Sequence, residues 1–147
     1  MGMPAHERLG LDLKRAEQEL MAAKHEAVKP LTVPQYAALF ALADNPGISA
    51  AALARACLVT PQAMTVVLRN LQDRGFVERT PHPWHRGVLE TRLTEAGRAA
   101  FDAADRRAAA IERRIADAFT AAERDTLREL LARFATAARG DADRPGR

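Results

Sequence analysis

The sequence predicts a mainly helical protein with one small β-hairpin. Of its 147 residues, 48% are hydrophobic but only 5% are aromatic, and alanine supplies much of the apolar total. This composition favours helices packed through small side chains over a β-rich core. A chain of this length fits one domain, which can bury about two-thirds of its unfolded surface without disulfides or metals.

The cysteine count and the first residues indicate in which cellular compartment the protein is found. The single cysteine, Cys57, excludes an internal disulfide. Residues 1–7 have neither the basic stretch nor the apolar run of a signal peptide. No window approaches about 18 consecutive apolar residues, the length that a membrane span needs. We therefore expect a cytoplasmic protein without a membrane partner.

Periodicity and capping signals predict the first two helices. Apolar residues recur at three- and four-residue steps over residues 7–28, which predicts an amphipathic helix that ends near Pro30. Thr32 and Gln35 can then exchange the two hydrogen bonds of a capping box. A second helix is expected from this cap to the turn at 44–47.

Two short helices with a tight connection should follow. Ser49 can cap a third helix that ends at Ala56, and Thr60 with Pro61 can open a fourth that stops at Gly75. The apolar stripe of the fourth helix comprises Met64, Val67, Leu68 and Leu71. Its opposite face carries Gln62, Thr65, Val66, Arg69 and Asn70.

The pattern then changes to that of a hairpin. Residues 76–79 are predicted to form a short strand, 81–87 a turn rich in proline and histidine, and 88–93 the returning strand.

Two more helices are predicted after the hairpin. Thr94 can cap the first of them, a long helix that reaches about Phe119. Its predicted apolar face comprises Ala96, Ala100, Ala103, Ala104, Ala108, Ile111 and Ile115.

A second capping box, Thr120 with Glu123, opens the last helix. Its apolar residues are Leu127, Leu130, Leu131 and Phe134. Residues 140–147 are polar, which predicts a disordered tail.

Three helices followed by a hairpin form a winged helix-turn-helix, in which the second helix of the motif enters the DNA major groove. We assign residues 31–94 to this DNA-binding domain. Residues 7–30 and 95–139 are expected to form a helical dimerisation region, because their apolar faces are too large for the winged domain to cover. The alternative is that these helices pack within one chain.

Charge supports double-stranded DNA as the partner. Residues 61–94 contain five arginines and three acidic residues, whereas residues 1–60 are balanced. Arginine pairs with guanine and glutamine with adenine, so Gln62, Thr65 and Arg69 are expected to contact bases or phosphates. Arg69 could instead be only a solvated charge. The full set of candidate DNA contacts is Arg55, Thr60, Gln62, Thr65, Val66, Arg69, Asn70, Trp84, His85 and Arg86.

Four stretches in order resemble the MarR (multiple antibiotic resistance regulator) family: LTVPQY at 31–36, ALAR at 52–55, LQDRGFVER at 71–79 and RLTEAGR at 92–98. The resemblance covers about residues 7–139. It implies a homodimer with intertwined terminal helices that binds a pseudopalindromic operator, typically as a repressor released by a small-molecule effector.

The same resemblance implies an effector pocket between the winged domain and the dimer helices. Its candidate residues are His25, Tyr36, Leu39 and Phe40, which could equally belong to the core.

The sequence departs from the family at two places. Val66 stands where many members carry an arginine, and an apolar contact to a thymine methyl is then expected. The wing lacks the usual aspartates, although Arg86 remains near the tip, where the family inserts a basic side chain into the minor groove. Trp84 could stack on DNA or simply shield the turn. These departures keep open an alternative, a winged-helix protein-interaction module without specific DNA binding.

Other chemistries find little support. His82 and His85 could suggest a metal site with Cys57 as a third ligand, but a wing tip and the turn of the motif should not meet, and we expect no metal. Cys57 lies in an apolar stretch, where a cysteine is usually a small core residue. Paired carboxylates, a Gly-rich phosphate loop and a Ser-His-Asp order are all missing, so we expect neither an enzyme nor a cofactor.

The wing histidine generates a first prediction. If His85 replaces the family's aspartate, an arginine loses its anionic neighbour and the wing gains a group that becomes charged near neutral pH. DNA binding should then be tighter at about pH 6 than at about pH 8. Titration of DNA with the wild type and with His85→Gln tests this, and a variant that keeps the same pH dependence would contradict it.

Overall fold

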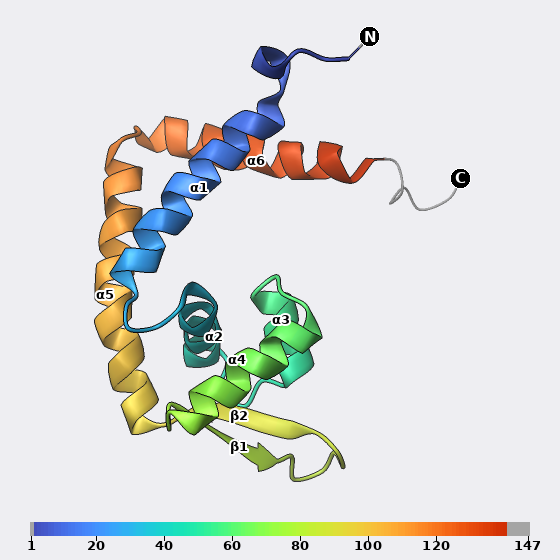
Figure 1. The fold of residues 1–147 in the computed structure, drawn as a ribbon, viewed down its shortest axis with the longest axis vertical. Helices are drawn as coiled ribbons and strands as arrows, with labels where there is room; N and C mark the ends of the chain where they lie inside the picture. The colour runs from blue at the N-terminus through green and yellow to red at the C-terminus, as the bar shows by residue number, and fades with distance from the viewer. Residues whose placement is uncertain (1, 141–147) are drawn as a thin grey trace. The chain divides into compact units, whose positions relative to one another are not determined.

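The computed structural model describes residues 2–140 (Figure 1). Residues 141–147 of the predicted tail lie outside the described residues. The elements in order are the 3-10 helix η1 (Ala5–Glu7), α1 (Leu9–Ala27), α2 (Val33–Asp44), α3 (Ala50–Ala56), α4 (Pro61–Asp73), β1 (Val77–Pro81), β2 (Leu89–Leu93), α5 (Glu95–Asp117) and α6 (Ala121–Arg139). The predicted class, mainly helical with one hairpin, is confirmed.

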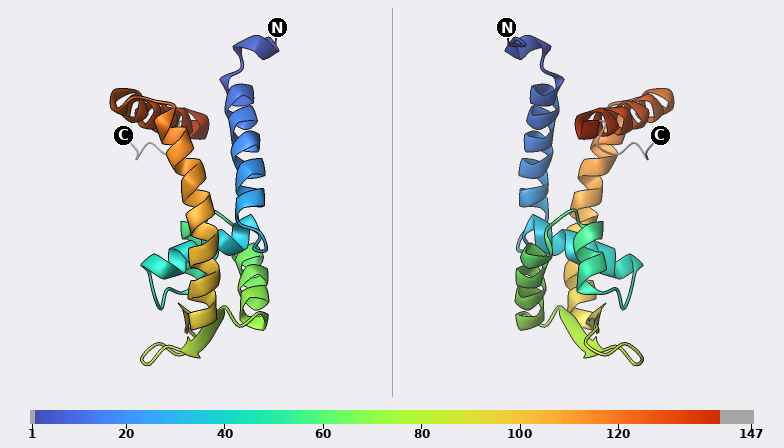
Figure 2. Two further views of the ribbon diagram at one scale, coloured as in Figure 1. Left: turned by 90° about the vertical axis from the view of Figure 1, so that its left-hand side faces the viewer. Right: turned by 90° about the vertical axis from the view of Figure 1, so that its right-hand side faces the viewer.

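The chain divides into two compact units, Met1–Ala109 and Ala110–Arg147. The boundary falls inside α5, which is one continuous helix. The first unit contains α1 to α4, the hairpin and the beginning of α5. The second contains the end of α5 and all of α6. Figure 2 shows the hairpin at one end of the first unit, where it projects beyond the helices.

The predicted helix starts are confirmed at the level of hydrogen bonds. In the capping box of α2, the Thr32 hydroxyl accepts from the Gln35 amide at 3.2 Å, and the Gln35 side chain accepts from the Thr32 amide at 3.0 Å. Ser49 and Thr60 accept from the Ala52 and Ala63 amides at the starts of α3 and α4. These polar caps satisfy amides that have no partner within the helix.

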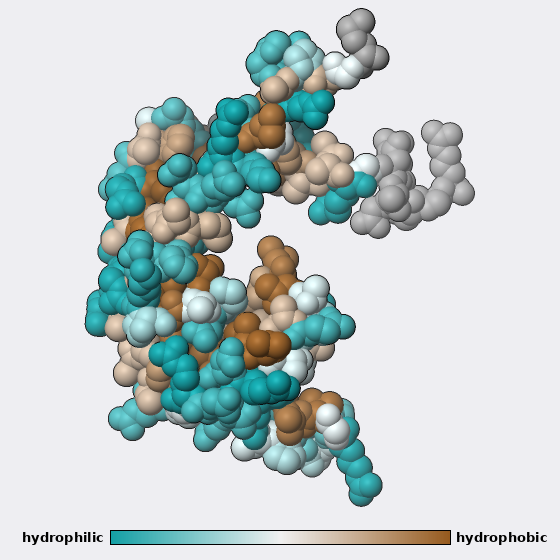
Figure 3. All heavy atoms as spheres, in the orientation of Figure 1, coloured by the Kyte–Doolittle hydropathy of each residue, from teal (hydrophilic) through white to brown (hydrophobic). Residues whose placement is uncertain are grey.

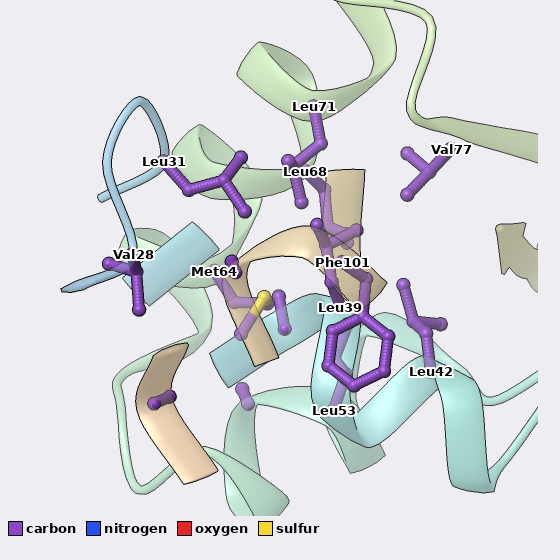
Figure 4. Packing of buried hydrophobic residues seen from close by; sticks show 14 residues of the cluster. Val28, Leu31, Leu39, Leu42, Leu53, Met64, Leu68, Leu71, Val77 and Phe101 are labelled. Atoms are coloured by element: carbon purple, nitrogen blue, oxygen red, sulfur yellow. The ribbon is translucent and has the colours of Figure 1, made fainter. Parts of the chain in front are cut away.

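The core of the first unit lies between α2, α3, α4, β1 and α5 (Figure 4). On α4 the predicted stripe is confirmed at Met64, Leu68 and Leu71, which are fully buried, whereas Val67 is only half-buried. Leu39 on α2 and Leu53 on α3 have no exposed surface. The interlocked leucines fix α4 against α2 and α3, because close-packed side chains allow little movement.

The predicted buried face of α5 is partly wrong. Ala96 is exposed and Ile115 is 38% exposed, while Gly97 and Phe101 are buried. The buried positions are Gly97, Phe101, Ala104, Ala108 and Ile111, at steps of four, three, four and three residues. Alanines lie on several sides of this helix, so the one large aromatic side chain, Phe101, determines which side is buried.

The hairpin has a simple antiparallel register that runs from Val77 opposite Leu93 to Pro81 opposite Leu89. The sequence predicts the first strand at 76–79 with Pro81 in the turn, and that boundary is wrong, because β1 continues through Pro81. A proline is tolerated there because a two-stranded sheet consists only of edges, where one ladder donor can be dispensed with.

Within residues 2–140, no single helix is long and apolar enough to cross a membrane. Only α3 and α4 taken together meet the length and composition requirements. They are bent by 108° from each other, and Leu53, Met64, Leu68 and Leu71 are buried in the core.

The base of the hairpin is joined tightly to the start of α5. The Thr94 amide donates to the Phe76 carbonyl at 3.1 Å, and the Thr94 hydroxyl donates to the Gly75 carbonyl at 2.5 Å. The same hydroxyl accepts from the Gly97 amide and so caps the helix. A Cβ atom at Gly97 would overlap the Phe76 carbonyl group. The first turn of α5 can approach this closely only because residue 97 has no side chain.

Replacement of Gly97 by alanine should therefore lower the free energy of unfolding by about 2 kcal/mol or more, because backbone must move to admit the methyl group. Gly10→Ala in α1 is the matched control. A Cβ there meets nothing within 4 Å, and the change should raise stability by up to about 1 kcal/mol. Urea unfolding followed by circular dichroism measures both, and equal stability of Gly97→Ala and wild type would refute the close approach.

Candidate nucleic-acid interface

The helix α4 presents a polar face opposite its buried stripe. Gln62, Thr65, Val66, Arg69 and Asn70, all predicted for DNA contact, are exposed on one side of the helix. The Arg69 and Gln62 side chains form no hydrogen bond or ion pair with any residue in 2–140. The Thr65 hydroxyl donates to the Pro61 carbonyl at 2.9 Å, which leaves its lone pairs available. The face therefore offers unused donors and acceptors on a rigid helix.

The turn between α3 and α4 contains an unusual residue. Leu58 has a φ of 56° and its side chain is 93% exposed. Its amide and that of Val59 donate to the Arg55 and Ala54 carbonyls, which closes the end of α3. Glycine is the usual residue for such a helix end, because a side chain is strained at positive φ. Arg55, another predicted contact, is exposed in the last turn of α3.

The far end of α4 is held by contacts that sequence reasoning missed. The Arg74 guanidinium donates to the Gln35 side-chain oxygen at 3.3 Å and lies 4.7 Å from the centre of the Phe76 ring. Gln35 is 7% exposed and also belongs to the α2 capping box. One amide oxygen thus ties the start of α2 to the end of α4. Arg74 is therefore a structural arginine, unlike Arg69.

The hairpin carries the remaining predicted contacts. Trp84 is 85% exposed, and His85 and Arg86 are exposed beside it in the turn. In Figure 1 the start of α4 and the tip of the hairpin lie toward the same side of the first unit. Figure 3 shows hydrophobic patches among hydrophilic side chains on this unit, and Leu58, Val66 and Trp84 are among its exposed apolar residues.

One face of the hairpin lies next to the start of α3. An open pocket of about 260 Å³ between them is lined by Ser49, Ala50, Ala51, Arg79, Gly87, Val88 and Leu89. The Nε atom of Arg79 is buried and has no hydrogen-bond partner within the described residues. In the middle of β2, the Thr91 carbonyl accepts from the amide of Gly47, in the turn between α2 and α3, at 3.0 Å. The hairpin is thereby attached to the helix-turn-helix on its inner side.

The four residues predicted for an effector pocket lie in different environments. Leu39 is fully buried, His25 is exposed on α1 and Phe40 is 48% exposed. The Tyr36 hydroxyl donates to Asp105 on α5 at 2.6 Å. The Tyr36 and Phe40 rings form a cluster with Phe101, with centroids about 6 Å apart. Sequence reasoning did not include Phe101 and Asp105, because they are distant in sequence.

No group of three or more metal-binding side chains occurs in the described part of the chain. His82 instead accepts backbone hydrogen bonds at the hairpin tip, and Cys57 packs half-buried against the core. A recognition helix on a helical core, followed by a hairpin with exposed arginine and tryptophan, defines a winged helix-turn-helix DNA-binding protein.

Comparison with known proteins gives the family. A MarR family model matches residues 29–86. The HTH-type transcriptional repressor Rv2887 of Mycobacterium tuberculosis is 35% identical over 133 residues, which are 89% of this chain and 96% of the relative. The chain belongs to the MarR family and is a DNA-binding transcriptional regulator.

Solved structures share the fold. The PcaV regulator of Streptomyces coelicolor matches with a TM-score of 0.83 at 23% identity, over 94% of this chain and 99% of its own. The repressor CouR bound to a 23-mer DNA duplex matches with a TM-score of 0.80 at 29% identity, over 92% and 99%. Rv2887 in complex with salicylic acid matches with a TM-score of 0.65 at 35% identity, over 86% and 96%.

The environment of Cys57 generates a chemical prediction. Burial raises the pKa of its thiol. Since the thiolate is the reactive form, iodoacetamide at about pH 8 should modify the native protein roughly tenfold more slowly than the urea-unfolded chain. Mass spectrometry of timed samples measures both rates, and equal rates would contradict a protected thiol.

Proposed function

We propose that this regulator represses transcription as a homodimer that binds a two-fold symmetric operator. The observation that carries the proposal is the exposed face of α4, where Arg69 and Gln62 have no partner within residues 2–140 although the helix beneath them is rigidly packed. Such preorganised donors suit the major groove. The names of two similar proteins, the repressors Rv2887 and CouR, support the direction of regulation.

Each candidate contact has a role that fits its position. Gln62, Thr65, Arg69 and Asn70 read base edges, and Val66 packs on a thymine methyl. Thr60 and Arg55, at the start of α4 and the end of α3, contact the phosphate backbone. Arg86, His85 and Trp84 follow the adjacent groove from the hairpin tip. The winged domain that we propose to bind DNA spans residues 31–94.

Dimerisation is assigned to the helices at both ends of the chain, 7–30 and 95–139. In the second unit Leu127, Leu130 and Leu131 are 36%, 45% and 45% exposed. Two of them, Leu127 and Leu130, line an open groove of about 320 Å³ together with Phe119, Ala122, Glu123 and Thr126. On α1, Leu9 is 70% exposed. Apolar surfaces of this kind are stabilised when a second chain covers them.

A small effector is proposed to bind at the aromatic cluster of α2 and α5. Tyr36, Phe40 and the more distant His25 would contact it, and the buried Leu39 would form the floor. Salicylic acid, bound by Rv2887, shows that one relative accepts a small aromatic molecule. Here the Tyr36 hydroxyl already donates to Asp105, so a ligand that accepts a hydrogen bond from this hydroxyl must displace the Asp105 carboxylate.

The regulator is proposed to act in the cytoplasm, and to act by binding DNA and an effector, not by catalysis.

The alternative, a protein-interaction module, is favoured by one observation. Leu58, Val66 and Trp84 are 93%, 53% and 85% exposed, and all three belong to the helix-turn-helix or the wing. Exposed apolar residues of this size also occur at protein interfaces.

Binding to DNA separates the two. The protein's own upstream DNA and an unrelated duplex of equal length are titrated at two salt concentrations, with DNA anisotropy and Trp84 fluorescence as readouts. We expect a preference of about a thousandfold that falls steeply with salt. Arg69→Ala should cost about 1–3 kcal/mol of specific binding. Arg86→Ala should weaken binding and reduce its salt dependence.

Arg106→Ala is the matched control, because this α5 arginine is exposed and also unpaired within residues 2–140. It should leave the preference for the upstream duplex intact. Equal, weak binding of both duplexes by the wild type would reject specific recognition of this DNA, and a loss in Arg106→Ala as large as in Arg69→Ala would reject the α4 face as the reader.

A further inference from the structure

The tip of the hairpin is organised by one side chain, His82. Its Nδ1 atom accepts hydrogen bonds from the backbone amides of Trp84 and His85, both at 3.1 Å. The His82 amide donates to the Val88 carbonyl at 2.8 Å, and the Val88 amide donates to the His85 carbonyl at 3.2 Å. The turn between the strands is therefore closed partly by backbone and partly by an imidazole.

His82 is also the covered member of the group. Its side chain is 21% exposed, whereas Trp84 is 85% exposed. The imidazole centroid lies 4.5 Å from that of His85 and 5.8 Å from the ring of Trp84. The rings of Trp84 and His85 thus both lie near the His82 imidazole, and the backbone amides of the same two residues donate to it.

The hydrogen bonds assign the proton of His82. An imidazole nitrogen that accepts has a free lone pair, so Nδ1 is unprotonated and the proton is on Nε2. Nε2 lies 3.7 Å from a carboxylate oxygen of Glu90 on β2, and the other Glu90 oxygen is 3.1 Å from the guanidinium of Arg92. The charged or titratable groups that face His82 are Glu90 and, behind it, Arg92 on β2, together with His85 in the turn.

We propose that neutral His82 is a positioning residue for DNA binding, which holds the wing tip so that Trp84 and Arg86 reach the duplex, and that protonation of His82 releases the tip. A doubly protonated imidazolium carries N–H groups at both nitrogens, so it cannot accept from the Trp84 and His85 amides. Glu90 attracts the added charge, but this carboxylate is already shared with Arg92.

This role rests on the proposed function, because it requires the wing to contact DNA. It also opposes the effect expected of His85. Protonation of the exposed His85 adds positive charge next to Arg86 and should tighten binding, whereas protonation of His82 should weaken it. The effects of the two histidines on DNA binding can therefore be told apart by substituting one histidine at a time.

The DNA probe is a duplex selected by the wild-type protein from a random-sequence pool, and its affinity is measured between about pH 5.5 and about pH 8. The background is His85→Asn, which removes the second imidazole of the tip. We expect this variant to lose affinity by roughly fivefold as the pH falls. Adding His82→Asn should abolish the loss, because the asparagine oxygen can accept the same amides without titrating.

His82→Leu, in the same background, removes the acceptor and should bind weakly at every pH. The asparagine variant thus restores what leucine loses, which a side chain needed only for bulk would not show. The proposal is wrong if the His82→Asn variant keeps the low-pH loss, or if His82→Leu binds as tightly as its parent at about pH 8.

A second measurement does not depend on DNA. In the free protein, ¹⁵N NMR reports the tautomer of His82 and the exchange protection of the Trp84 and His85 amides. We expect a proton on Nε2 near pH 8 and a loss of protection as His82 becomes charged. If no duplex is enriched from the pool, the proposed function fails, and NMR still decides whether His82 holds the tip. Unprotected amides at high pH would overturn that role.

Discussion

The contact on which this architecture depends is the approach of the first turn of α5 to the backbone of Gly75 and Phe76. Four elements meet there, because α4 ends at this point, the hairpin begins and ends at it, and α5 starts from it. The Thr94 side chain serves two elements at once, as donor to the Gly75 carbonyl and as cap of α5. Gly97 allows the separation to be short. The recognition helix and the wing are thereby built on one rigid point.

Much of the fold could be predicted from local chemistry. Thr32, Ser49, Thr60 and Thr120 mark helix starts because a side-chain oxygen next to unpaired amides is a signal contained within four residues. The face of α5 could not be read in the same way, since alanines surround the helix and only the tertiary contacts of Phe101 and Gly97 show which side is buried. The end of β1 is not predicted correctly, because a proline indicates a turn more often than an edge strand.

In the candidate site, too, features with a local sequence pattern could be predicted, and contacts between residues distant in sequence could not. The exposed face of α4 follows from helical periodicity, so the sequence alone places Gln62, Thr65, Val66, Arg69 and Asn70 together. The Tyr36 to Asp105 and Arg74 to Gln35 hydrogen bonds join residues 69 and 39 positions apart and have no local signature. The role of His82 was hidden for another reason: the charge of a histidine suggests contact with solvent or metal, whereas here its lone pair is used by the backbone.

The continuity of α5 restricts how the sequence can change. The helix runs from the base of the hairpin, through the boundary at Ala109, into the second unit without a loop. A single residue inserted near that boundary would rotate everything beyond it by about 100° and displace it by about 1.5 Å. Loops elsewhere absorb insertions, but here the whole C-terminal part of the protein would turn. Length changes in α5 should therefore be tolerated only in near-integral numbers of turns, such as seven or eleven residues, which makes this helix the natural place to re-engineer the geometry of the protein.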